Sequence, residues 1–135
     1  MSAAKSILVV DDSAMIRETL LQFLALLGFR EVDCAIDGSD ALLKLRTKSY
    51  DLVISDWEME PMPGNQLIQT MRREDALRQI PFITVSAGPF DEEATRAGAD
   101  GFLPKPFRMA ALRAKIEQVC SWEIKSPKPE SAKPL

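Results

Sequence analysis

Residues 7–13 read Ile-Leu-Val-Val-Asp-Asp-Ser, so an uninterrupted apolar run of four residues stops at two aspartates. An apolar run without polar alternation is typical of a β-strand that is buried on both faces of a parallel sheet. Residues 16–27 then place Ile, Leu and Phe side chains at helical spacing, with Ser13 as a possible N-cap and Gly28 placed to end the helix. This stretch therefore predicts a strand followed directly by a helix.

The same alternation recurs along the rest of the chain. Further strands are predicted at residues 32–36, 52–54, 82–85 and 101–103, each followed by a helical pattern. The helix after residues 82–85, the fourth of the chain, is short, at 91–97. The second of these strands alternates polar and apolar residues, which favours the edge of the sheet. Parallel strands need crossover connections, and such crossovers are right-handed. Five strand and helix units therefore predict a doubly wound α/β fold, a five-stranded parallel sheet with helices on both faces.

The length of 135 residues suits one domain, and 46% hydrophobic with 27% charged residues is ordinary for a globular chain. We expect residues 1–123 to form the domain. Residues 124–135 are rich in Pro, Ser and charge, with little to bury. They are expected to be a disordered tail or the start of a linker.

Composition also excludes several kinds of function. The net charge is -3, without a Lys or Arg cluster on any expected helix face, so no nucleic-acid partner is predicted. No apolar run is long enough for a signal peptide or a membrane span, which predicts a cytoplasmic protein with no membrane partner. Histidine is absent, which removes the commonest general base. Cys34 and Cys120 lie far apart in the sequence, so we interpret them as reduced packing thiols.

Polar residues gather where the predicted strands end. Asp11 and Asp12 end the first strand, Asp56 follows the third, Ser86 the fourth, and Lys105 comes after the fifth. Each alone is as easily a helix cap or a solvated charge. However, the ligand crevice of an open α/β sheet lies at the carboxyl ends of its strands, where these groups would converge. Three carboxylates at one edge need a compensating cation, and Mg²⁺ suits a site of few oxygen ligands.

Four motifs stand in order at these strand ends: Val9-Val10-Asp11-Asp12-Ser13 with Arg17, Ile54-Ser55-Asp56 with Pro61 and Gly64, Val85-Ser86-Ala87, and Gly101-Phe102-Leu103-Pro104-Lys105-Pro106-Phe107. With these motifs the chain resembles, from about Ser6 to Val119, the receiver domains of two-component response regulators, of which the single-domain chemotaxis regulators are one kind. The resemblance implies a flavodoxin-like sheet with strand order 2-1-3-4-5. It also implies a cis peptide bond between Lys105 and Pro106.

The resemblance further implies roles for individual residues. Asp56 would be the phosphoacceptor, assisted by Ser86 and Lys105, and Mg²⁺ would be bound by Asp11, Asp12, Asp56 and the backbone carbonyl of Glu58. Ser86 and Phe102 would form the switch that responds to phosphorylation. Ser86 replaces the more frequent Thr of the family, Phe102 the frequent Tyr, and the segment between Ser86 and Lys105 is shorter than expected. Because the shorter segment leaves little for the fourth helix, we expect the output surface to differ from the usual one of the family.

The function implied by the resemblance is a phosphoacceptor signalling switch. A sensor histidine kinase or a histidine phosphotransfer protein would donate the phosphoryl group to Asp56 in a Mg²⁺-dependent reaction, in which the domain catalyses its own phosphorylation and dephosphorylation. An unknown downstream protein would then contact the altered face between Ser86 and Phe107. The domain would act as a monomer or as a phosphorylation-dependent dimer.

Two other functions stay open at this point. A phosphohydrolase with an aspartate nucleophile would use Asp56 with the nearby Glu58, and would turn over a phosphate ester steadily. A binding scaffold that is never phosphorylated would not respond to beryllofluoride with Mg²⁺. Arg72 and Arg73 fall on the polar side of the third predicted helix, where a solvated position is expected.

Overall fold

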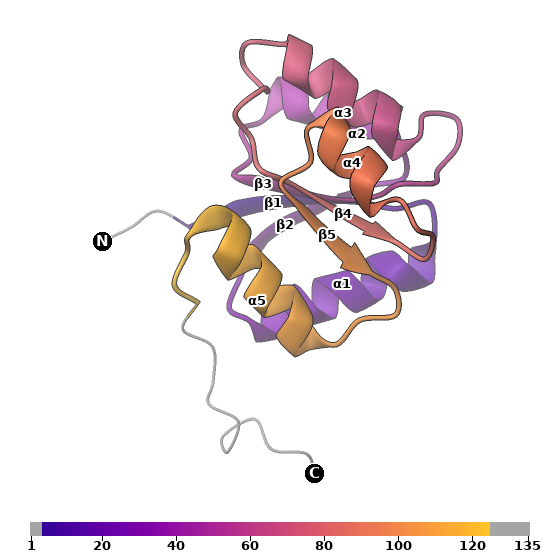
Figure 1. Ribbon diagram of the computed structural model, residues 1–135. Helices are drawn as coiled ribbons and strands as arrows, with labels where there is room; N and C mark the ends of the chain where they lie inside the picture. The colour runs from indigo at the N-terminus through magenta and orange to yellow at the C-terminus, as the bar shows by residue number, and fades with distance from the viewer. Residues whose placement is uncertain (1–3, 125–135) are drawn as a thin grey trace.

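The computed structural model describes residues 4–124, in which strands and helices alternate five times (Figure 1). The strands are β1 (Ser6–Val10), β2 (Glu31–Ala35), β3 (Leu52–Asp56), β4 (Phe82–Ser86) and β5 (Gly101–Pro104). The helices are α1 (Ala14–Leu26), α2 (Gly38–Thr47), α3 (Gly64–Arg73), α4 (Asp91–Ala97) and α5 (Met109–Cys120). The predicted doubly wound α/β fold is confirmed.

The strands form one parallel sheet in the order β2-β1-β3-β4-β5, as the resemblance implied. β2 lies at the edge, as its alternating pattern predicted, but it ends at Ala35, and Ile36 is 55% exposed beyond it. In the register of the central strands Val10 pairs with Ser55, and Asp56 with Val85. The carboxyl ends of β1, β3 and β4 therefore lie side by side at one edge of the sheet.

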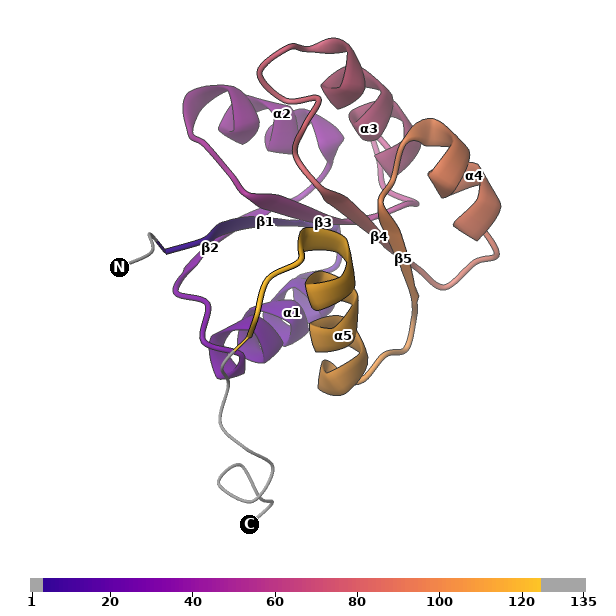
Figure 2. The same cartoon turned by 60° about the vertical axis from the view of Figure 1, so that its left-hand side comes forward.

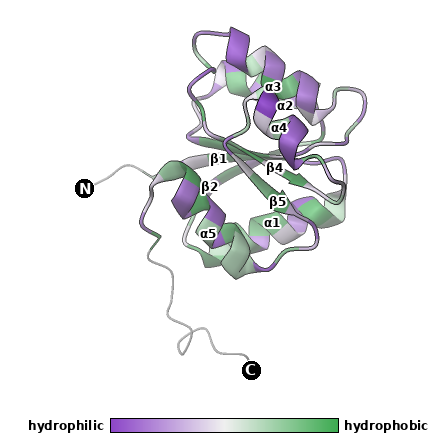
Figure 3. Cartoon of the chain, viewed as in Figure 1, coloured by the Kyte–Doolittle hydropathy of each residue, from purple (hydrophilic) through white to green (hydrophobic). Residues whose placement is uncertain are grey.

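Helices α2, α3 and α4 cover one face of the sheet, and α1 and α5 cover the other (Figure 2). Successive residues of a strand point to opposite faces, so Leu8 and Val10 pack in the first layer while Ile7 and Val9 pack in the second. In Figure 3 the strands are coloured mainly as hydrophobic, whereas α3 and α4 carry hydrophilic residues. Burial on both faces explains the continuous apolar runs of the sequence.

Local signals fix the ends of the helices. The Ser13 hydroxyl caps α1 by accepting a hydrogen bond from the Ile16 N–H at 3.3 Å. Gly28, with φ of 98°, follows α1, and Gly98, with φ of 111°, caps α4. The short fourth helix lies at residues 91–97, where the sequence predicted it.

The solvated position predicted for Arg72 is wrong. Its guanidinium donates hydrogen bonds to the backbone carbonyls of Arg78, Ile80 and Gly98, at 2.9 to 3.2 Å, and pairs with Asp100 at 3.1 Å. Arg72 thus ties the end of α3 to the residues around β4 and to the end of α4. A helical pattern could not reveal this, because the acceptors are carbonyls of loops that follow in the sequence.

The packed chain extends one residue beyond the expected domain end at residue 123. Ile124 is 5% exposed and packs in the α1 and α5 layer, and its carbonyl accepts a hydrogen bond from Arg113 at 2.7 Å. The remainder of the expected tail, residues 125–135, lies outside the described residues. Among helices in residues 4–124, none has the length and hydropathy needed to cross a membrane.

Candidate functional site

Three carboxylates meet at the carboxyl edge of the sheet. Asp11 and Asp12 follow β1, Asp56 ends β3, and one carboxylate oxygen of each lies within 4.8 Å of the others. Asp11 is 1% exposed and Asp56 8%, whereas Asp12 is exposed. The arrangement thus combines two buried acids with one that faces solvent.

Asp11 is held in place through most of its polar atoms. Its N–H donates to the carbonyl of Ala35 at 3.1 Å, and its Oδ1 accepts from the Ser13 N–H at 2.9 Å. The guanidinium of Arg17 donates to the Asp11 backbone carbonyl at 2.6 Å. These bonds fix the loop between β1 and α1, and with it the position of Asp12.

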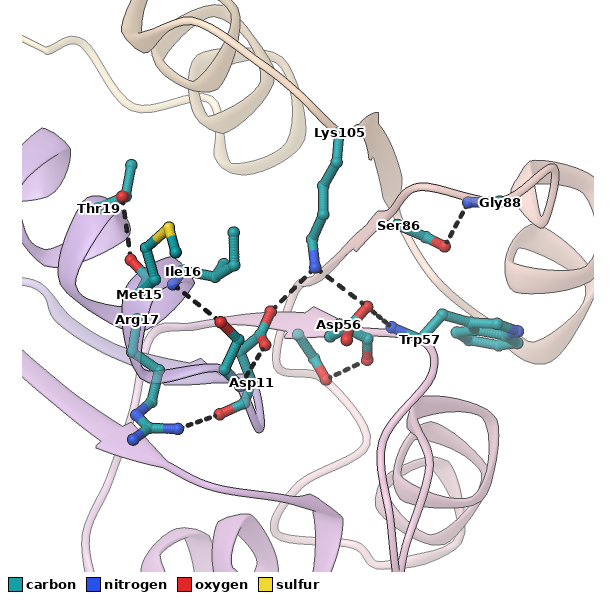
Figure 4. A network of polar contacts seen from close by, with 12 residues as sticks. Asp11, Met15, Ile16, Arg17, Thr19, Asp56, Trp57, Ser86, Gly88 and Lys105 are labelled. Carbon is teal, nitrogen blue, oxygen red and sulfur yellow. Dashed lines mark hydrogen bonds and ion pairs between the residues drawn. The ribbon is translucent and has the colours of Figure 1, made fainter.

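Lys105 joins the two buried acids (Figure 4). Its Nζ lies 3.2 Å from Asp11 Oδ2 and 3.5 Å from Asp56 Oδ1. The Lys105 N–H donates to the carbonyl of Ser86 at 2.9 Å, which anchors the loop after β5 to the end of β4. The predicted cis peptide bond between Lys105 and Pro106 is confirmed, and a second one, which the sequence did not predict, precedes Pro61.

The electrostatics of Asp56 follow from this crowding. Burial raises the pKa of Asp56 above its ordinary value, and the negative charge of Asp11 raises it further. Lys105 and the backbone N–H groups of Trp57 and Glu58 oppose this rise, Trp57 donating to Asp56 Oδ1 at 2.8 Å. A single ammonium for three carboxylates leaves an excess of negative charge, so the site favours a further cation.

The Ser86 side chain is fully buried beside the acids, yet its hydroxyl is turned away from them. The Gly88 N–H donates to Ser86 Oγ at 3.1 Å, and Figure 4 shows the hydroxyl directed toward Gly88 rather than Asp56. Phe102 lies on β5, half-buried against the apolar layer under α2, α3 and α4.

An open pocket of about 770 Å³ lies in front of the acids. Its walls include Asp12, Glu58 and Trp57, and also Phe90, which comes from the segment between β4 and α4. Glu58 is exposed and lines this pocket. A reactant that approaches Asp56 through this pocket would meet acidic and aromatic side chains.

The structure brings together Asp11, Asp12, Asp56 and Lys105, as the strand ends predicted. It also shows two residues that sequence reasoning missed as parts of the site. Arg17 belongs to the first sequence motif, and its spacing from Asp11 places it in the first turn of α1, within reach of the Asp11 carbonyl. Phe90 follows Gly88 and Pro89 directly, and an aromatic residue so close to a strand end is a signal that could have indicated it.

Comparisons with known proteins agree with this geometry. The family model described as "Response regulator receiver domain" matches residues 7–117. The chain is 34% identical over 116 residues to "Chemotaxis protein CheY-3" of Vibrio cholerae, covering 84% of this chain and 89% of the relative. It has a TM-score of 0.81 and 30% identity with the solved chemotaxis response regulator CheY4 of Vibrio cholerae, covering 87% of this chain and 99% of that one.

A further solved structure bears on the acidic edge. The receiver domain of a sensor histidine kinase from Pseudomonas aeruginosa, described "with magnesium ion coordinated in the active site cleft", matches with a TM-score of 0.81 and 26% identity. The match covers 89% of this chain and 100% of that one. With the family model and the identity to chemotaxis regulators, the chain belongs to the receiver domain family of two-component response regulators, whose members are phosphoacceptor signalling switches.

Proposed function

We propose that Asp56 is the phosphoacceptor of this receiver domain. The observation that carries the proposal is the position of Asp56 at the end of β3, with the Lys105 ammonium 3.5 Å from its Oδ1 and the open pocket in front of the acidic edge. The neighbouring acids, Asp11 and Asp12, keep the site strongly negative in the absence of a cation. Asp56 thus has a positioned cation and directly precedes Trp57 and Glu58, which line the pocket.

The reaction is the transfer of a phosphoryl group from a phosphohistidine. A carboxylate oxygen of Asp56 attacks phosphorus, the P–N bond breaks, and its electron pair stays on the departing imidazole nitrogen. The product is an acyl phosphate, which water hydrolyses to phosphate and the free carboxylate. Because phosphoryl transfer depends mainly on positioning and on neutralised charge, the domain catalyses both steps on itself with few groups. Lys105 supplies one positive charge, and the Ser86 hydroxyl supplies a hydrogen bond once it turns toward the phosphoryl oxygens.

The donor set fits Mg²⁺. Carboxylates are hard oxygen ligands, and their excess negative charge over Lys105 is what a divalent ion compensates. Asp11, Asp12, Asp56 and the backbone carbonyl of Glu58 would hold the ion. When bound, it would neutralise charge on the transferred phosphoryl group.

The donor is proposed to be a sensor histidine kinase or a histidine phosphotransfer protein, and the reader a downstream protein that contacts the face between Ser86 and Phe107. The domain would work in the cytoplasm, as a monomer or as a dimer that forms on phosphorylation. Sedimentation with and without beryllofluoride would distinguish these two states.

Fluorescence can test the assignment without a kinase. Trp57 is 4% exposed and follows Asp56 directly, so in a Trp122→Phe background the emission reports on this site. Beryllofluoride with Mg²⁺ should change the emission of that protein and leave the emission of an additional Asp56→Asn variant unchanged. A response that persists in Asp56→Asn, or is absent from both proteins, would remove Asp56 from the role.

A further inference from the structure

Phe90 stands between the Ser86 hydroxyl and helix α4. Its N–H donates to the Gly88 carbonyl at 3.0 Å, and its own carbonyl accepts from the Ala94 N–H at 2.8 Å, the first turn of α4. Phe90 is the N-cap of that helix, without a side chain that caps it. A shift of Phe90 therefore displaces the start of α4.

The Phe90 ring rests directly on Gly88. A Cβ built on Gly88 would lie 2.5 Å from Cε2 and 3.0 Å from Cδ2 of that ring, so the contact exists only because the residue is glycine. The N–H of the same glycine donates to Ser86 Oγ at 3.1 Å. Ser86, Gly88 and Phe90 therefore form a continuous chain of contacts from the end of β4 to α4.

Phe90 also faces the candidate phosphorylation site. Its ring is half-buried against the apolar layer under α2, α3 and α4, and it lines the pocket together with Asp12 and Trp57. The residue thus contacts both the mouth of the site and the packed core. Phe102, the aromatic expected to respond, lies on β5, as predicted, and is not among the residues that line this pocket.

We propose that Phe90 couples phosphorylation of Asp56 to helix α4, an inference that rests on the proposed function. While the Ser86 hydroxyl accepts a hydrogen bond from the Gly88 N–H, the turn at Gly88 keeps its conformation and the Phe90 ring stays in contact with it. When the hydroxyl turns to a phosphoryl group on Asp56, the Gly88 N–H loses its acceptor and the turn is released. The ring then leaves Gly88, and α4 moves with its N-cap.

Gly88→Ala tests the coupling in the unphosphorylated protein. The added methyl group collides with the ring and should displace it as phosphorylation does. Amide hydrogen exchange in residues 91–97 should then be about fivefold faster than in the wild type, since overpacked contacts are destabilising. Gly88→Ala combined with Phe90→Ala should return toward the rate of Phe90→Ala alone, because the colliding ring is gone.

The matched experiment uses beryllofluoride with Mg²⁺. In the wild type and in Phe102→Leu, the ligand should change the amide exchange of residues 91–97. In Phe90→Ala this change should be lost even at ligand concentrations that saturate the Trp57 fluorescence titration of the variant, whatever its affinity. Two results would overturn the coupling: a double variant that exchanges as fast as Gly88→Ala, or a Phe90→Ala protein with the wild-type response in α4. If the wild type shows no fluorescence response at all, the proposed function is wrong. The Gly88→Ala comparison then still tests whether the contact between the Phe90 ring and Gly88 controls α4.

Discussion

The ammonium of Lys105 lies 3.5 Å from a carboxylate oxygen of Asp56, although the two residues are 49 positions apart in the sequence. The same ammonium lies 3.2 Å from Asp11. In the unphosphorylated protein Lys105 therefore occupies the carboxylates that we assign to the metal. This competition leads to the first prediction.

Lys105→Ala should bind Mg²⁺ more tightly, because a positive charge next to the metal site is removed. We expect a gain of roughly threefold to tenfold in affinity, equivalent to about 0.7–1.4 kcal/mol. The Trp57 titration in the Trp122→Phe background measures it, and Lys5→Ala, at the opposite edge of the sheet, controls for net charge. Weaker binding in Lys105→Ala would show that the lysine organises the acids rather than competing for them. In the same variant, binding of the downstream partner to the phosphorylated protein should be weakened more than the rate of phosphorylation is lowered.

Asp12→Ala should weaken Mg²⁺ binding without weakening the fold. Asp12 is exposed and close to two other acids, so its removal takes away a metal ligand and also relieves repulsion. In EDTA the variant should unfold at the wild-type temperature or higher, while the stabilisation of the wild type by added Mg²⁺ should be largely lost. An unchanged Mg²⁺ titration would remove Asp12 from the ligands.

Glu58→Gln should speed phosphorylation by acetyl phosphate by roughly threefold to tenfold at low salt, and less at high salt, because an anionic donor no longer meets this carboxylate at the pocket mouth. Glu60→Gln is the matched control, since Glu60 lines the same pocket two residues further on. Equal rates for Glu58→Gln and the wild type would mean that the carboxylate turns into solvent. A slower variant would indicate that Glu58 helps to bind the metal or to orient water.

Arg72→Met should destabilise the domain by roughly 2–3 kcal/mol, because it leaves partly buried carbonyls around β4 and α4 without their donor. Arg73→Met is an adjacent control, exposed on the same helix, and should change the unfolding free energy little. Urea unfolding measures both. Similar midpoints for the two variants would mean that water replaces the guanidinium at no cost.

The sequence predicted the sheet and its acidic edge because both depend on local patterns. Apolar runs end in Asp11, Asp56 and Ser86, and parallel strands bring such ends together. The orientation of the Ser86 hydroxyl, which points away from the acids, depends instead on the side-chain rotamer and on the nearby Gly88 N–H. That contact could not be predicted from spacing.

The positions of Arg72 and Ile124 could not be predicted from the sequence for a different reason. A polar residue on a helix is usually solvated, and a residue at the start of a Pro-rich stretch usually belongs to it. Each was placed by contacts that depend on how separate elements pack, Arg72 on the carbonyl of Gly98 and Ile124 on the side chains of α5. Only the assembled fold supplies such partners.

The most direct test of the central claim is covalent labelling of Asp56. Wild-type protein incubated with acetyl phosphate and Mg²⁺, then reduced with borohydride and digested, should yield the peptide around residue 56 with that aspartate converted to homoserine. Asp56→Asn and a wild-type sample in EDTA should yield the unmodified peptide. Conversion of another carboxylate in the wild type, or labelling of Asp56→Asn at the wild-type level, would contradict the assignment of Asp56 as the phosphoacceptor.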